Sequence, residues 1–224
     1  MDESPEKEKL NVLIYSKTGG FRHDCIEPGG AALISYFDAK GIKAIQTEDS
    51  SLFNGNKLDP FDVVIFFQTT GNVLDSVQQQ ALVNHVRSGK GFVGIHSAAD
   101  TEYDWPWYTG LVGAQFASHP EIQQAAIVKI DTQHLACKHL PERWTRTDEW
   151  YNFKNIPSNV NVLLTIDEAT YQGGSHGSPH PMSWNHTYDG GRSFYTAMGH
   201  TVESYQDSLF LEHVVQGVKW AGNK

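Results

Sequence analysis

The chain has few cysteines, few basic residues and no long apolar run. Its 224 residues include only Cys25 and Cys137, too few for a disulfide framework or a zinc site of four thiolates, so we expect reduced thiols. No apolar run reaches about 18 residues, which excludes a transmembrane helix. The net charge of -9 opposes nucleic-acid or anionic-membrane binding, because both need basic surfaces. This composition predicts a small substrate that is not strongly anionic. It also predicts that neither nucleic acid nor a membrane is a partner.

The start of the chain lacks the apolar core of a secretory signal. Residues 1–10 are mostly polar and charged, which predicts a solvated tail and a cytoplasmic protein. Residues 11–222 are expected to form a single domain, because a chain of this length buries a substantial core and contains no linker or repeat. The composition, 39% hydrophobic and 19% charged, is typical of a folded protein. The composition does not determine the oligomeric state, and a homo-oligomer is compatible with it.

The first hundred residues alternate between strand-like and helix-like patterns. Short continuous apolar runs indicate strands covered on both faces, and apolar residues at helical spacing lie between several of them. This alternation predicts an α/β fold with a mostly parallel sheet and helices on both faces. The expected strands are 11–16, 43–47, 62–68 and 91–95, and the expected helices are 30–40 and 75–88.

The second half is predicted to be richer in β-structure. Four further strands are expected, followed by a closing helix over 202–220 whose apolar residues have helical spacing. Asp189-Gly190-Gly191 is a strong hairpin-turn pattern between the last two strands. The expected strands are 122–130, 160–166, 181–187 and 192–197.

Four histidines follow strand-like or glycine-containing segments. His96 comes directly after the apolar run 91–95, and His23, His119 and His200 follow comparable segments. In an open parallel sheet, ligands bind at the carboxyl ends of the strands. Imidazole either transfers protons near neutral pH or binds a metal through a neutral nitrogen. We therefore expect these histidines to share one site; the alternative for each is a structural hydrogen bond to backbone at a turn.

A family resemblance is carried by residues 94–101, 103–108, 111–114, 118–120, 148–149, 151 and 191–200. These segments resemble the ThuA-like family, named after a trehalose-utilisation protein, and the resemblance extends from about residue 11 to 220. It implies a flavodoxin-like three-layer α/β sandwich like that of class I glutamine amidotransferases. Those enzymes have a cysteine nucleophile where this chain has His96, so amidotransferase chemistry is not expected. The resemblance also implies carbohydrate metabolism, with trehalose-like disaccharides or 3-keto-glycosides as substrates.

The predicted catalytic residues are His96, Glu149 and His200. A carbonyl at the third carbon of a sugar acidifies the neighbouring C–H bond, so His96 or Glu149 as a base would permit β-elimination of the glycosidic oxygen. His200 would stabilise the enolate. A divalent metal such as zinc, held by His23, His96 and His200, is the other way to stabilise it. The sequence leaves the choice between these two open.

Further residues are predicted to bind the sugar. Flat aromatic rings cover the apolar faces of sugars, and charged or imidazole groups hydrogen-bond hydroxyls. Packing of the aromatics against the core and surface ion pairs of the arginines are the alternative roles. The predicted substrate-binding residues are Arg22, His23, Trp107, His119, Trp184 and Arg192.

Two other function classes compete with such a lyase or hydrolase. The first is a non-catalytic sugar-binding or regulatory protein on an amidotransferase-like scaffold, in which the aromatics matter and the histidines do not. The second is a hydrolase that uses Ser97 beside His96. It is disfavoured because the sequence has no Gly-x-Ser-x-Gly elbow.

Overall fold

The computed structural model describes residues 9–156 and 158–223, so most of the predicted tail 1–10 lies outside the described residues. Its main feature is a nine-stranded sheet with the strand order β2-β1-β3-β4-β11-β10-β9-β6-β7, accompanied by a two-stranded sheet of β5 and β8. The strands are β1 (Asn11–Tyr15), β2 (Lys43–Thr47), β3 (Val63–Phe67), β4 (Gly91–Ile95), β5 (Gln115–Ser118), β6 (Gln123–Lys129), β7 (Arg143–Asp148), β8 (Asn152–Lys154), β9 (Asn161–Ile166), β10 (Pro181–Tyr188) and β11 (Gly191–Thr196).

The large sheet has a parallel and an antiparallel half. Strands β2, β1, β3, β4 and β11 run parallel to one another. From β11 onward, β10, β9, β6 and β7 pair antiparallel. The chain therefore has a mixed α/β fold in which the predicted parallel sheet holds for the first half and the predicted β-rich region forms the second. The predicted turn joins β10 to β11, with Asp189 at φ 45° and Gly190 at φ 97°.

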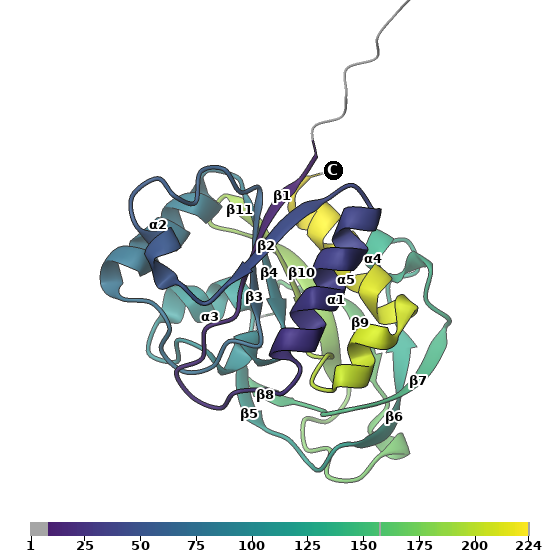
Figure 1. The fold of residues 1–224 in the computed structure, drawn as a ribbon. Coiled ribbons are helices and arrows are strands. Elements are labelled where there is room, and N and C mark those ends of the chain that lie inside the picture. Colours follow the sequence, from purple (N-terminus) through teal and green to yellow (C-terminus); the bar gives the residue numbers. More distant parts are fainter. Residues whose placement is uncertain (1–8, 157, 224) are drawn as a thin grey trace, which may run out of the picture.

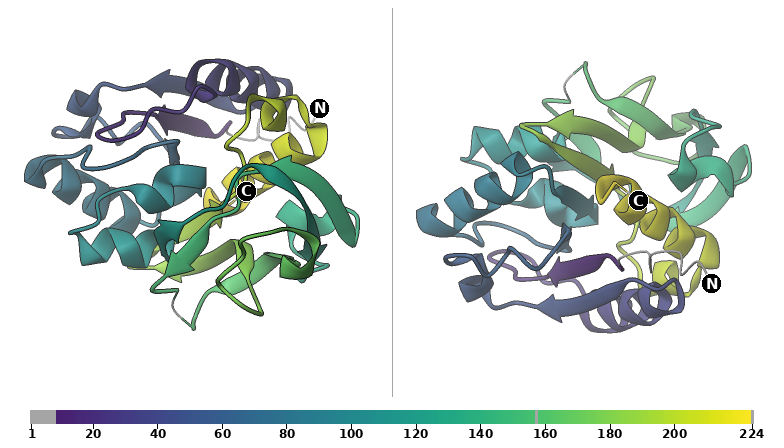
Figure 2. Two further views of the ribbon diagram at one scale, coloured as in Figure 1. Left: turned by 90° about the horizontal axis from the view of Figure 1, so that it is seen from below. Right: turned by 90° about the horizontal axis from the view of Figure 1, so that it is seen from above.

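Helices cover both faces of the parallel half. Helices α1 and α5 lie on one side of the sheet and α2 and α3 on the other, as Figure 1 and both views of Figure 2 show. No helix among residues 9–156 and 158–223 has the length and hydrophobicity needed to cross a bilayer. The α-helices are α1 (Ile26–Ala39), α2 (Ser76–Arg87), α3 (Pro106–Val112), α4 (Leu135–Lys138) and α5 (Ser208–Ala221); the 3-10 helices are η1 (Ser50–Phe53), η2 (His96–Asp100), η3 (Glu168–Thr170) and η4 (Val202–Gln206).

The central strands are the apolar runs of the sequence. Every residue of β3 and β4 is buried, as expected for strands covered on both faces. The helix predicted over 75–88 is α2, which begins with a capping box of Asp75 and Gln78. The helix predicted over 202–220 is divided into η4 and α5, because Asp207 has an extended backbone and caps the N-terminus of α5.

Candidate functional site

Four side chains meet where strands end at one edge of the sheet. His23 lies in the loop after β1, His96 directly after β4, Glu149 directly after β7 and His200 shortly after β11. β1, β4 and β11 are parallel, so their carboxyl ends lie at the same edge. Four antiparallel steps separate β7 from β11, so β7 points the same way. The topology thus brings these four residues together from distant parts of the chain.

The cluster of His23, His96, Glu149 and His200 is compact. Each residue offers one nitrogen or oxygen atom, and these four atoms all lie within 4.8 Å of one another. His96 Nε2 is 3.1 Å from His200 Nδ1. Glu149 Oε2 is 3.3 Å from each of these nitrogens. The His23 ring packs edge-on against both other imidazoles, with centroids 5.2 Å from His96 and 4.9 Å from His200.

The backbone and neighbours of His96 hold its ring in one orientation. Its φ is 51°, a left-handed conformation that is uncommon outside glycine and concentrates at functional sites. Its Nδ1 lies 2.6 Å from the carbonyl of Ala197. Since a carbonyl only accepts, Nδ1 carries a hydrogen, and Nε2 is the ring nitrogen that faces the cluster. The Tyr195 hydroxyl donates to the His96 carbonyl at 2.6 Å, and the Tyr151 ring packs on the imidazole with centroids 4.2 Å apart.

The surroundings shift the pKa values of the cluster residues in different directions. Burial, together with the charges of the neighbouring imidazoles His96 and His200, lowers the pKa of His23 to about 3. Burial acts to raise the pKa of Glu149, but hydrogen bonds from His200 and His96 outweigh it and hold the pKa well below its usual range. Burial opposes the charged form of His200, yet the hydrogen bond and charge of Glu149 raise its pKa. Glu149 is therefore ionised at neutral pH, His23 is neutral, and His200 is the imidazole whose cationic form Glu149 favours.

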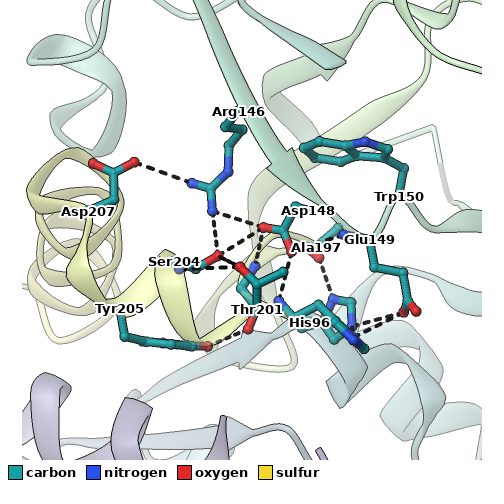
Figure 3. Close-up of polar contacts among 12 residues, drawn as sticks. His96, Arg146, Asp148, Glu149, Trp150, Ala197, Thr201, Ser204, Tyr205 and Asp207 are labelled. Carbon is teal, nitrogen blue, oxygen red and sulfur yellow. Dashed lines mark hydrogen bonds and ion pairs between the residues drawn. The ribbon is translucent and has the colours of Figure 1, made fainter. Parts of the chain in front are cut away.

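A second, fully buried carboxylate holds two of the strand ends together. Asp148 accepts hydrogen bonds from the backbone N–H groups of Gly199 at 2.8 Å and His200 at 3.0 Å. It also accepts from the Arg146 guanidinium at 2.9 Å, the Ser204 hydroxyl at 3.2 Å and the Glu149 backbone N–H at 3.0 Å. Figure 3 shows this carboxylate between the arginine and the cluster. Asp148 thus ties the end of β7, from which Glu149 projects, to the loop that carries His200.

Gln68, which follows β3, also holds the loop that carries His200. Gln68 has φ 57°, and its amide donates to the Gly199 carbonyl at 2.7 Å. The Tyr205 hydroxyl donates to the same carbonyl at 2.8 Å. With Asp148 accepting from the N–H of His200 and two donors on the Gly199 carbonyl, the Gly199–His200 peptide group is fully hydrogen-bonded, which fixes the backbone from which the His200 ring projects.

The structure brings together five of the residues predicted for the site. His23, His96, Glu149 and His200 form the cluster. His119 lies at its edge, with Nδ1 3.1 Å from Glu149 Oε1 and its side chain 43% exposed. The predicted metal-ligand set of His23, His96 and His200 is thus assembled in space, with Glu149 added to it.

The other four predicted residues lie outside the cluster. Arg22 is exposed and pairs with Glu27 and Glu48. Trp107 donates to Asp189 in the β10–β11 turn at 2.7 Å. Arg192 pairs in register with Gly91, the first residue of β4, and so lies at the opposite end of that strand from His96. Trp184 is completely buried and donates to the Val112 carbonyl.

Sequence reasoning missed the residues that support the cluster. β7 was not expected, although Trp144, Arg146 and Asp148 are buried in alternation with exposed neighbours. The period of two was available in the sequence. It was obscured because two of the three inward side chains are charged, whereas inward strand residues are normally apolar. Tyr151 was noted only as part of the family resemblance, although its ring packs on His96.

The cluster fits a divalent cation or a shared proton. His96 Nε2 and His200 Nδ1 lie 3.1 Å from each other and 3.3 Å from the same carboxylate oxygen of Glu149, so a proton or a cation is needed among these three atoms. The Nδ1 atom of His23 is buried and has no hydrogen-bond partner. Three imidazoles and one carboxylate are a donor set that zinc accepts. The Ala197 carbonyl on the other nitrogen of His96 is the outer contact that metal-binding histidines commonly make.

Comparison with protein families identifies the chain. The model of the ThuA family, described as trehalose utilisation, matches residues 11–221. The chain belongs to the ThuA family. The match spans β1 to α5 and includes all four residues of the cluster. The comparison with curated proteins finds no match.

Solved structures share the fold of this ThuA-family chain at low sequence identity. A ThuA-like protein of Bacteroides uniformis has a TM-score of 0.80 at 22% identity, covering 97% of this chain and 94% of its own. A cytoplasmic protein of Salmonella typhimurium has a TM-score of 0.65 at 10% identity, with coverages of 95% and 99%. A GMP synthase-type protein of Thermoplasma acidophilum has a TM-score of 0.54 at 13% identity, with coverages of 96% and 97%.

Proposed function

We propose that this ThuA-family protein is an enzyme of carbohydrate metabolism that acts on a disaccharide or 3-keto-glycoside by proton transfer. The observation that carries the proposal is the cluster of His23, His96, Glu149 and His200 at the carboxyl edge of the sheet. The trehalose-utilisation description of the family supports a sugar as the substrate. The net charge of -9 agrees with a neutral ligand and disfavours nucleic acid or an anionic membrane as a partner.

Glu149 and His200 form the acid–base pair of the proposed reaction. Groups whose pKa values are pushed apart by their environment are candidates for opposite roles. Glu149 is ionised and so can take the proton from the carbon beside the sugar carbonyl, although the hydrogen bonds that lower its pKa also make it a weaker base. His200, whose pKa Glu149 raises, stabilises the negative charge that develops on the carbonyl oxygen. His96 holds the pair in place through its 3.1 and 3.3 Å contacts.

A divalent cation such as zinc is the alternative source of positive charge at the same place. His23, His96, His200 and Glu149 would bind it through the facing atoms of the cluster. When bound, it would polarise the sugar carbonyl as a Lewis acid. The unpartnered Nδ1 of His23 supports this version, because His23 has no assigned task in the metal-free one.

We further propose that the scaffold is a flavodoxin-like sandwich of the class I glutamine amidotransferase type, adapted to different chemistry. Helices on both sides of a parallel half-sheet support this, as does the likeness to the Thermoplasma acidophilum protein. His96, at φ 51° after a buried strand, occupies the kind of strained strand-to-helix turn that presents a nucleophile in related α/β enzymes. A cytoplasmic location agrees with the description of the Salmonella typhimurium neighbour, and a homo-oligomer remains part of the proposal.

Turnover of 3-keto-glycosides tests the proposed function directly. Purified protein is incubated with 3-keto-trehalose with and without added zinc, and product is measured by chromatography. We expect turnover that falls by at least about 100-fold in Glu149→Gln, the general-base variant. Glu142→Gln, which changes an exposed glutamate, is the control and should retain full activity. A wild-type protein that binds the sugar without converting it would instead support the receptor alternative.

Elemental analysis distinguishes the two versions of the chemistry. Protein purified without chelator is analysed for metals, and the same analysis is made on His23→Ala. The cation version predicts a stoichiometric metal in the wild type and its loss in the variant, because one of four ligands is gone. Active wild-type protein without stoichiometric metal would leave Glu149 and His200 as the working pair.

A further inference from the structure

A third carboxyl group, that of Asp100, lies in the short helix that begins at the cluster residue His96. Asp100 is the last residue of this helix, η2. Its backbone is anchored to the end of β3, because the Gly71 N–H donates to the Asp100 carbonyl at 2.9 Å. Its side chain is half-buried, so it is held in place yet remains accessible. None of the roles assigned above uses this carboxyl group.

The hydrogen bonds around Asp100 can be satisfied when its carboxyl group is protonated. The Tyr103 hydroxyl is 2.6 Å from Asp100 Oδ1 and 3.1 Å from the carbonyl oxygen of Phe116. A phenol has a single hydrogen and cannot donate fully to both oxygens. If the carboxyl group holds a proton, it donates to the phenol oxygen and the phenol donates to Phe116. Both hydrogen bonds are then satisfied.

Phe116, whose carbonyl lies 3.1 Å from the Tyr103 hydroxyl, also links this segment to the cluster. The Phe116 ring packs against Tyr151 with centroids 4.4 Å apart, and Tyr151 packs on His96 at 4.2 Å. Burial raises the pKa of Asp100. The Tyr103 hydrogen bond and the charges of His96 and His119 oppose this rise, whereas the charge of Glu149 adds to it. The surroundings thus raise the pKa of Asp100 and lower that of Glu149.

We propose that Asp100 is the general acid that protonates the departing glycosidic oxygen, positioned by Tyr103. This inference rests on the proposed function, which assigns a base and an enolate-stabilising group but no donor for the leaving group. An alkoxide or sugar oxygen leaves poorly without a proton, so the elimination needs such a donor.

The proposed elimination needs only groups of the protein and solvent to balance its protons and electrons. Glu149 takes the proton from the second sugar carbon, and the C–H electron pair becomes an enolate on the carbonyl at the third carbon. That pair then forms the double bond between the first and second carbons as the bond to the glycosidic oxygen breaks. The oxygen keeps the bonding electrons, takes the proton of Asp100 and departs as an alcohol. Solvent returns a proton from Glu149 to Asp100, and no oxidant or reductant is consumed.

Two substrates that differ in their leaving group test the assignment. The kcat/KM of wild type and Asp100→Asn is measured with 3-keto-trehalose and with 4-nitrophenyl 3-keto-α-glucoside. We expect the variant to lose about 100-fold or more on the disaccharide but less than about 10-fold on the nitrophenyl substrate, because 4-nitrophenolate leaves without a proton. Tyr103→Phe should lose activity with the same selectivity and a smaller magnitude. Asp104→Asn changes an exposed carboxylate in the same segment and should behave as wild type.

The outcomes separate this inference from the proposed function. Equal losses on both substrates in Asp100→Asn and Tyr103→Phe, with wild-type thermal stability, would overturn the general-acid role and leave the proposed function intact. If Asp100→Asn is unstable, the selectivity of Tyr103→Phe decides in the same way. A wild-type protein that converts neither substrate would overturn the proposed function and this inference together.

Discussion

A buried ion pair between Arg146 and Asp148 supports the cluster. Arg146 and Asp148 are 6% and 0% exposed, and their charged groups are 2.9 Å apart. Arg146 also packs on the rings of Trp144 and Phe210, at 4.6 and 4.8 Å from the ring centroids. Removing one member of a buried pair leaves an uncompensated charge, which costs more than the pair itself contributes.

Arg146→Met is therefore expected to destabilise the protein by about 3–5 kcal/mol, as measured by urea denaturation. Arg143 on the same strand provides the control, because its pair with Asp167 is largely exposed, at 52% and 34%. Arg143→Met should change stability by no more than about 1 kcal/mol. Equal effects of the two substitutions would mean that burial of the Asp148 carboxylate is not costly.

Individual site residues were predictable to different degrees. His23, His96 and His200 could be chosen because each follows a strand or a glycine-containing segment, and such positions face the ligand edge of a parallel sheet. Trp107 was chosen for its residue type alone, and it lies at the β10–β11 turn. Residue type indicates which chemistry a side chain can perform but not where the fold places it.

At the scale of elements, the end of α3 shows how closely a helix approaches the sheet. Gly113 follows α3 with φ 92°. A β-carbon built on it would lie 2.6 Å from Nε1 of Trp184, a fully buried side chain that cannot move aside. The glycine is thus required both for the left-handed conformation and for the close contact.

Gly113→Ala is expected to cost about 1 kcal/mol for the backbone conformation and a further 1–3 kcal/mol for overpacking. Gly41, which follows α1 at φ 73° with no atom within 4 Å of a built β-carbon, separates the two contributions. Gly41→Ala should cost only the conformational part, about 1 kcal/mol. Thermal and urea unfolding of both variants measure the difference, and equal costs would contradict the close packing on Trp184.

The elements themselves were predicted best where the pattern was simplest. The apolar runs of β3 and β4 and the periodic helix α2 were expected almost at their observed bounds. The strands β5, β7 and β8 and the short helices α3 and α4 were not. Short strands and strands with charged inward residues lack the hydrophobic periodicity on which such predictions depend.

For the whole molecule, buried histidines make stability depend on pH. Burial lowers the pKa of His85 to about 4 and that of His213 to about 3, and it also lowers the pKa of His186. The unfolded chain has histidine pKa values of about 6.5. Below that pH the unfolded state binds more protons than the folded state, so stability decreases as pH falls. This contribution is fully present above about pH 6.5 and is lost toward the folded pKa values.

His213→Gln tests this at one residue, since His213 donates to the Ala136 carbonyl at 2.7 Å and a glutamine amide also donates. Between about pH 6 and 4, the free energy of unfolding of the wild type should fall more steeply than that of the variant, by about 1.4 kcal/mol per pH unit. Urea denaturation in the presence of a chelator measures both slopes. Parallel slopes would show that His213 does not remain neutral in the folded protein.

The sequence by itself determined the α/β class, the alternation of the first half, the edge of the sheet to which the histidines belong and the family resemblance. These features depend on hydrophobic periodicity and on local turn geometry, which neighbouring residues specify. Only the tertiary structure decided that Glu149 completes the cluster, that Asp148 is a buried support and that Arg22, Trp107, Trp184 and Arg192 lie outside it. Contacts of about 3 Å between residues distant in sequence depend on how the strands pair and pack, which local patterns do not encode.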